Sequence, residues 1–135
     1  MTLITPANVE VDTVTLMANP GPSGNLIAAA AILAAAPCVI ESDGDVAMSD
    51  GTAANAAGAV HGFSVKEYSI GEQVTLAGPG TRFRYAAGMT PGDQLFNGAT
   101  AGRLDDTATT GDTLGIAYAV SATDIVFTNT KLIGA

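Results

Sequence analysis

Few residues in this sequence have side chains that could attack a substrate or transfer a proton. The chain has one cysteine, Cys38, and one histidine, His61. A thiol that lacks a neighbouring base is a weak nucleophile, so we expect Cys38 to be buried and unreactive. His61 alternates with Phe63 on an expected strand, where a lone histidine is more often a structural or interface residue than a general base. No HExxH, CxxC, GxSxG or P-loop lysine pattern occurs, so the sequence predicts a non-enzymatic protein without catalytic residues.

Acidic residues form two short clusters whose oxygens could in principle bind calcium. The members are Asp105, Asp106 and Asp112 in one cluster and Ser42, Asp43 and Asp45 in the other. Neither cluster has the spacing of an EF-hand or its terminal bidentate glutamate. Aspartate commonly accepts hydrogen bonds from its own backbone in turns, so we expect turn and loop roles, no metal site and no cofactor. A hydrolase with dispersed carboxylates would require two acids that converge in a cleft.

The charge balance argues against a nucleic-acid partner. Thirteen acidic residues and five basic ones give a net charge of −8. All the basic residues lie at Lys66 or beyond, and they are scattered. Binding to phosphates needs clustered lysine and arginine, which this chain lacks.

The apolar run 26–36 (LIAAAAILAAA) is too short for a membrane span, which needs about 20 residues. No positively charged region precedes it, so it makes a poor signal peptide, and we interpret the chain as mature protein with no membrane partner. Alanine favours helix, whereas the length and the flanking glycine and proline fit a helix or a strand. The sequence leaves that choice open.

Elsewhere, glycine, proline and Asp-Gly recur at short intervals between stretches of β-branched and aromatic residues, which is typical of an all-β protein. The expected strands are 9–17, 38–41, 45–48, 58–65, 73–77, 81–86, 94–96, 113–120 and 124–130. Asp43 and Gly44 predict a hairpin, because Asp-Gly tolerates the positive φ of hairpin turns. Gly78, Pro79 and Gly80 predict a tight connection between two strands.

Residue alternation predicts which side chains are buried. Phe83 and Tyr85 share one face of an expected strand, so they should face the core while Arg82 and Arg84 reach solvent or a partner. In the stretch LGIAYAV, small residues alternate with large ones. We expect this small-residue face to lie close to another sheet or another subunit.

A weak internal repeat has a period of about 57 residues and suggests a duplicated β-unit in a small β-barrel or β-sandwich. One copy covers 38–65 and the other 94–121. Coincidence of turn chemistry is the alternative explanation. We expect residues 1–24 to form an extended N-terminal arm and residues 25–135 to form a single β-rich domain.

The stretches APCVIESDGDVAMSDGT, AVHGFSV, GEQVTLAGPGTRFRYAAG and TPGDQLFNGATAGRLDDTATTGDTLGIAYAVSATDIVF carry a resemblance to a known family. In their order of short strands and glycine turns, over about residues 35–130, they resemble the capsid decoration, or cement, proteins of tailed bacteriophages. The resemblance implies a non-enzymatic protein on the outer capsid surface of the virion, made in the host cytoplasm. It further implies binding to the major capsid protein lattice, often as a homotrimer, which stabilises the head. No short contact motif allows capsid-binding residues to be assigned.

Two other classes of protein remain as alternatives. One is a β-sandwich virion or surface adhesin that binds host glycans, which should show a pocket with exposed aromatic rings. The other is the small hydrolase with dispersed carboxylates. Self-association is expected independently, because the run 26–36 and the small-residue face offer more flat apolar surface than a small domain easily covers.

Overall fold

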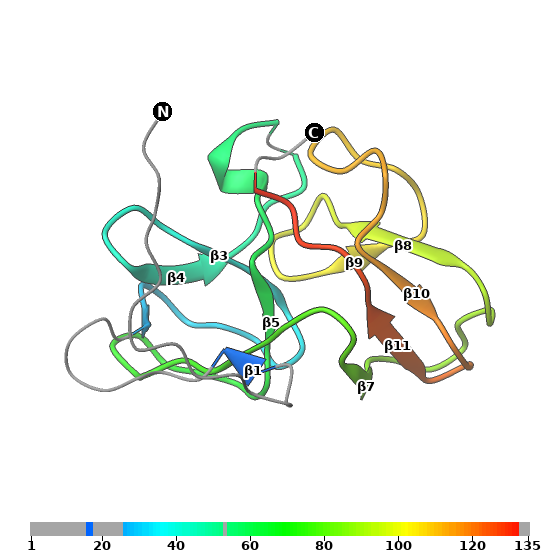
Figure 1. The fold of residues 1–135 in the computed structure, drawn as a ribbon, viewed down its shortest axis with the longest axis horizontal. Helices are drawn as coiled ribbons and strands as arrows, with labels where there is room; N and C mark the ends of the chain where they lie inside the picture. Colours follow the sequence, from blue (N-terminus) through cyan, green and yellow to red (C-terminus); the bar gives the residue numbers. More distant parts are fainter. Residues whose placement is uncertain (1–15, 18–25, 53, 133–135) are drawn as a thin grey trace, which may run out of the picture.

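The computed structural model describes residues 16–17, 26–52 and 54–132, which form short β-strands in two sheets (Figure 1). The six-stranded sheet contains β1 (Leu16–Met17), β2 (Ile27–Ala28), β3 (Pro37–Ile40), β4 (Asp45–Met48), β5 (Gly62–Ser64) and β6 (Leu76–Ala77). The five-stranded sheet contains β7 (Arg82–Arg84), β8 (Gln94–Asn97), β9 (Leu104–Asp105), β10 (Ala117–Ala119) and β11 (Asp124–Phe127). In the described ranges the helical structure is the 3-10 turn η1 (Ala56–Gly58), so the predicted all-β class is confirmed.

The two sheets repeat one connectivity. In the first, the β3–β4 hairpin is extended by β5 beside β3, then by β6, then by β1. In the second, the β8–β9 hairpin is extended in the same way by β10, then by β11, then by β7. All these pairings are antiparallel, and β2, which pairs in parallel with β4, lacks a counterpart. The repeat seen in the sequence is therefore confirmed at the level of strand topology.

Each sheet has its own cluster of buried side chains. The first cluster consists of Ala28, Ile32, Ala36, Cys38, Val46, Tyr68, Val74 and Leu76. The second consists of Val60, Phe63, Leu95, Ile116, Ala117, Ala119, Ile125 and Phe127. Phe63 lies on β5 of the first sheet, yet its ring packs 4.7 Å from that of Phe127 and 5.2 Å from that of Phe83. This aromatic contact therefore joins the two sheets, and each such pair contributes about 0.5–1.5 kcal/mol beyond its buried area.

The β3–β4 hairpin forms at the predicted turn. Cys38 pairs with Met48, and the Gly44 N–H donates to the Glu41 carbonyl at 2.9 Å. Gly44 has a φ of 92°, the left-handed conformation that glycine adopts without a steric penalty. The Asp43 carboxylate accepts the Asp45 N–H at 2.9 Å, as expected for an Asx turn.

The alternation predicted for β7 is confirmed: the aromatic side chains point inward and the arginines point outward. Arg82 and Arg84 are exposed, whereas Phe83 and Tyr85 are half-buried and pack against the second cluster. The small-residue face of β10 packs inside the domain, since Ala117 and Ala119 belong to the second cluster, which also holds Phe63 of the first sheet.

The run 26–36 is neither a helix nor a long strand. It contains β2 and then an isolated bridge between Ile32 and Tyr68. Most of its backbone is irregular, and its buried apolar side chains belong to the first cluster. The Gly-Pro-Gly stretch does connect two strands, but it carries the chain from one sheet to the other: β6 precedes it and β7 follows it. Gly80 has a φ of 92° there.

The expected arm, residues 1–24, lies outside the described residues apart from β1. That strand pairs with β6 at the edge of the first sheet, where Leu16 lies opposite Ala77 and Met17 opposite Leu76. The predicted strand 9–17 is therefore described only over its last two residues, 16–17.

Candidate functional site

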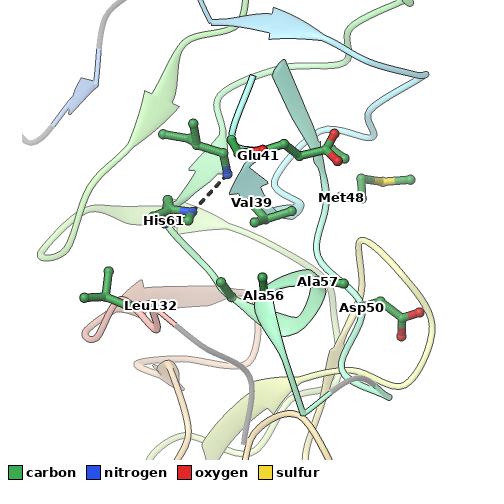
Figure 2. Close-up of a pocket in the computed structure, with 12 residues that line it drawn as sticks. Val39, Glu41, Met48, Asp50, Ala56, Ala57, His61 and Leu132 are labelled. Atoms are coloured by element: carbon green, nitrogen blue, oxygen red, sulfur yellow. Dashed lines mark hydrogen bonds between the residues drawn. The ribbon is translucent and has the colours of Figure 1, made fainter. Parts of the chain in front are cut away.

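A pocket of about 520 Å³ opens beside the β3–β4 hairpin (Figure 2). Val39 and Ala47 lie opposite each other in the hairpin and line it. They share a face because strand side chains alternate, and Cys38 and Val46 on the opposite face enter the first core cluster. The floor of the pocket is therefore the side of the hairpin that faces away from that core.

A second wall comes from the loop that follows β4. Asp50 donates its N–H to the Ala57 carbonyl at 3.1 Å, and the Asn55 side chain caps η1 by accepting the Ala57 N–H at 2.9 Å. Ala56, Ala57 and Ala59 therefore lie along one side of the pocket. Small side chains at these positions leave the pocket open.

His61 lines the pocket at the point where β5 leaves β3. Its N–H donates to the Cys38 carbonyl at 2.8 Å, but Val60 pairs instead with Lys131, through hydrogen bonds of 2.7 and 2.8 Å. The Ile40 N–H donates to the side chain of His61, at 2.9 Å from Nδ1, and not to the backbone of a neighbouring strand. Nδ1 therefore acts as an acceptor, which fixes a neutral imidazole with its proton on Nε2. Burial also lowers the pKa of His61.

Replacing His61 with leucine should destabilise the fold in a pH-dependent way. The change leaves the Ile40 N–H without its acceptor, which costs about 1–3 kcal/mol. Because the pKa of His61 is lowered in the folded state, the unfolded chain binds more protons just below pH 6.5, so wild-type stability falls as the pH drops through that window.

Urea unfolding of both proteins at pH 7.5 and pH 5.5 measures this effect. The loss caused by His61→Leu should be smaller at the lower pH, because the wild type has by then lost part of what His61 contributes. An equal loss at both values would contradict the neutral, structural role of this imidazole.

Cys38 is buried, as expected, and its thiol donates to the Ala36 carbonyl at 3.2 Å. Burial raises the pKa of this thiol to about 12, against a smaller lowering by hydrogen bonds with Ser64. The fraction of reactive thiolate near neutral pH is therefore very small.

Asp43, Asp105 and Asp106 act in turns and loops, as predicted. Asp105 accepts the Thr107 N–H at 3.1 Å, and Asp106 bonds the Thr107 hydroxyl at 3.2 Å. Asp112 is separated from them in role, because it is fully buried at the junction of the two sheets. Within the described ranges, no group of three or more histidine, cysteine or acidic side chains could hold a metal ion.

The Asp112 carboxylate is the centre of a buried polar junction that the sequence did not predict. Oδ2 accepts the Asn97 N–H at 2.8 Å, and Oδ1 accepts the N–H groups of Gly115 at 2.8 Å and Leu114 at 3.2 Å. Lys131 Nζ lies 3.5 Å from Oδ1. One carboxylate thus satisfies three backbone donors and lies beside a cation that is itself largely buried.

The side chain of Asn97 extends this junction to the first sheet. Its Nδ2 donates to the Ser49 hydroxyl at 2.8 Å, directly after β4. Its Oδ1 is buried without a hydrogen-bond partner among the described residues. Ser49 and Asn97 are far apart in the sequence, so no local pattern could have revealed the contact.

No protein-family model matches the chain, and no curated protein matches it. Across the described ranges, no helix has the length and apolar character that a membrane crossing requires.

Proposed function

We propose that this chain is a non-enzymatic capsid decoration protein of a tailed bacteriophage, which binds the outer surface of the major capsid protein lattice and stabilises the head. The observation that carries the proposal is a row of side chains on the solvent face of the second sheet. Arg82, Val126, Tyr118 and Gln94 are neighbours in register across β7, β11, β10 and β8. We call this set the outer row.

The composition of the outer row suits protein binding. Tyr118 is 39% exposed although it lies in the middle of the sheet, and Arg82 is exposed at the edge strand. Tyrosine and arginine are enriched among the residues that dominate the binding energy of protein interfaces. Leu114 lies next to the row, since its carbonyl accepts a hydrogen bond from the Gln94 side chain, and it is 73% exposed.

Mechanical reinforcement requires no chemistry from these residues. A protein that binds the assembled lattice and not its dissociated subunits adds its binding free energy to the assembled state, about 2.7 kcal/mol at a concentration of 100 times Kd. The proposal includes a homotrimer on the virion surface. It is supported by the resemblance of residues 35–130 to decoration proteins and by the all-β duplicated fold.

Glycan binding, the alternative function, gains no specific support from the pocket. Apart from His61 and Met48, the described residues that line it are aliphatic, acidic or hydroxylic, so these residues offer a sugar no tyrosine or phenylalanine ring for stacking. We therefore do not propose it.

Co-sedimentation with undecorated capsids of the source phage tests the proposal. The wild-type chain should pellet with capsids in a saturable way. Tyr118→Ala should raise Kd at least tenfold, a loss of about 1.4 kcal/mol in binding free energy. Ile70→Ala is the matched control, because Ile70 is a 72% exposed apolar residue outside the outer row. A wild-type chain that stays in the supernatant would refute the function, and equal binding by Tyr118→Ala would refute the assignment of the outer row.

A further inference from the structure

The second sheet has an open edge at β7. This strand stands at the end of the strand order and pairs only with β11 among the described strands (Figure 1). Phe127 donates its N–H to the Thr81 carbonyl at 3.1 Å, and bonded pairs recur at every second residue of an antiparallel ladder. Phe83 therefore bonds to β11 as well, whereas the N–H and C=O groups of Arg82 and Arg84 point away from it. None of these groups has a hydrogen-bond partner among the described residues, so β7 can accept a further strand.

A small groove of about 230 Å³ lies beside β7, between the two sheets. Phe83 and Arg84 line it from β7, and Ser64 and Ala77 line it from β5 and β6, together with the exposed side chain of Val65. The volume is below the usual range for small-molecule sites, about 300–1,000 Å³, and suits an aliphatic side chain. A strand added at β7 would direct alternate side chains to the face that Phe83 occupies, and so toward this groove.

The other face of β7 is positively charged. Arg82 and Arg84 are both exposed there. Arg82 Nε lies 3.0 Å from Asp124 Oδ2, whereas Arg84 forms no ion pair with a described residue. Residues that lie opposite each other in paired strands share a face. A fitting strand therefore has acidic residues opposite the two arginines and an aliphatic residue between them, opposite Phe83.

We propose that residues 9–13 of this same chain, with the sequence Val-Glu-Val-Asp-Thr, are that strand and bind antiparallel to the open edge of β7. The segment alternates aliphatic and acidic residues, and no lysine or arginine occurs before Lys66 to repel the arginines. The opposed pairs are Glu10 with Arg84, Val11 with Phe83 and Asp12 with Arg82. The docked strand would close an edge that could otherwise pair with another molecule.

The position of β1 places the start of this strand within reach of β7. Leu16 lies opposite Ala77 in an antiparallel pair, so a strand that continues β1 toward the N-terminus would follow the connection from β6 to β7. Asp12 precedes Leu16 by four residues, and Arg82 follows Ala77 by five. The connection must therefore accommodate one extra residue, as a β-bulge does, and Gly80 has the positive φ, 92°, that one common bulge requires. The inference does not depend on the proposed function, because it concerns the chain alone.

Amide hydrogen exchange measured by NMR tests the docking. In the full-length chain, the Arg82 and Arg84 amides should exchange at least tenfold more slowly than in a variant that lacks residues 1–13 and keeps β1. The Phe83 amide is the internal control for the stability of the sheet, because its bond to β11 is present in both proteins. Equal exchange at Arg82 and Arg84 in the two proteins would overturn the proposal. Protection that disappears on dilution would overturn the assignment to the same chain, in favour of the segment of a second copy.

Charge reversal in the full-length chain tests the register. Glu10→Arg should lower the protection factor of the Arg82 amide several-fold, and Arg84→Glu in the same chain should restore it, since the opposed charges are then exchanged. Arg103→Glu is the matched control for the second substitution, because Arg103 is exposed and lies outside β7. Failure of Arg84→Glu to restore protection, or equal restoration by Arg103→Glu, would overturn the pairing of Glu10 with Arg84. Capsid co-sedimentation can succeed or fail independently of these results.

Discussion

Replacing Asp112 with asparagine should lower the free energy of unfolding by about 3–5 kcal/mol, because removing one partner of a buried, hydrogen-bonded ion pair is strongly destabilising. Asp112 is fully buried, and its two oxygens accept N–H groups from Asn97, Leu114 and Gly115. The amide of asparagine would direct N–H groups toward at least one of these donors. It would also leave Lys131 Nζ, 3.5 Å from Oδ1, without the carboxylate.

Urea denaturation of Asp112→Asn and Asp106→Asn measures this loss. The control removes one exposed carboxylate from a neighbouring loop, where surface substitutions change stability by about 0.5 kcal/mol or less. Lys131→Met separates the two parts of the junction, because it leaves Asp112 with its three backbone donors. It should cost less than Asp112→Asn. Equal unfolding midpoints for Asp112→Asn and Asp106→Asn would refute the central role of Asp112.

Short sequence patterns predicted the parts of this fold that depend on a few neighbouring residues, such as turns and the inward or outward direction of strand side chains. Asp43 and Gly44 specified the hairpin because a positive φ is a property of the turn itself. Alternation specified the inward direction of Phe83 because a strand places successive side chains on opposite faces. Repeated turn spacing indicated a duplicated unit, and the two sheets share one connectivity.

Features set by contacts between distant segments were missed. The sequence around Val60 reads as one continuous strand, but Val60 pairs with Lys131 instead of following β3, so β5 begins only at Gly62. In the LGIAYAV stretch, Ile116 lies before β10 and is buried, whereas the alternation within β10 itself directs Ala117 and Ala119 inward and Tyr118 outward. Neither change has a signal within a few residues.

The candidate site shows the same division. The strand position of His61 favours a structural or interface role over catalysis, yet its acceptor role for Ile40 depends on where the chain before β5 turns away from β3. Glu41 and Asp50 come from the hairpin and from the following loop, and their shared pocket arises only when η1 folds against the hairpin. Asp112 resembles its neighbouring loop acids in sequence but differs from them in its burial, its three backbone donors and its ion pair with Lys131.

Gly51 should be the least replaceable of the glycines at this junction. It is buried, its N–H donates to the Gly98 carbonyl at 2.9 Å, and its carbonyl accepts the Gly111 N–H at 2.6 Å. A Cβ at this position would overlap the carbonyl oxygens of Asn97 and Gly98, which are backbone atoms and have no rotamer to change. Gly51→Ala must therefore separate the loop after β4 from the end of β8, and we expect a loss of about 3 kcal/mol, the upper part of the usual range for overpacking.

Gly88→Ala is the comparison variant, because it tests the cost of a left-handed backbone conformation without a steric overlap of the new Cβ. Gly88 has a φ of 75°, and a Cβ there would meet nothing within 4 Å, so alanine should cost about 1 kcal/mol through the left-handed conformation alone. Gly51 does not have such a positive φ, so its loss would come from the steric overlap. Urea midpoints of the two variants should therefore differ clearly, with Gly51→Ala the less stable. If Gly51→Ala unfolds at the same urea concentration as Gly88→Ala, the two sheets are not held together by this close backbone contact.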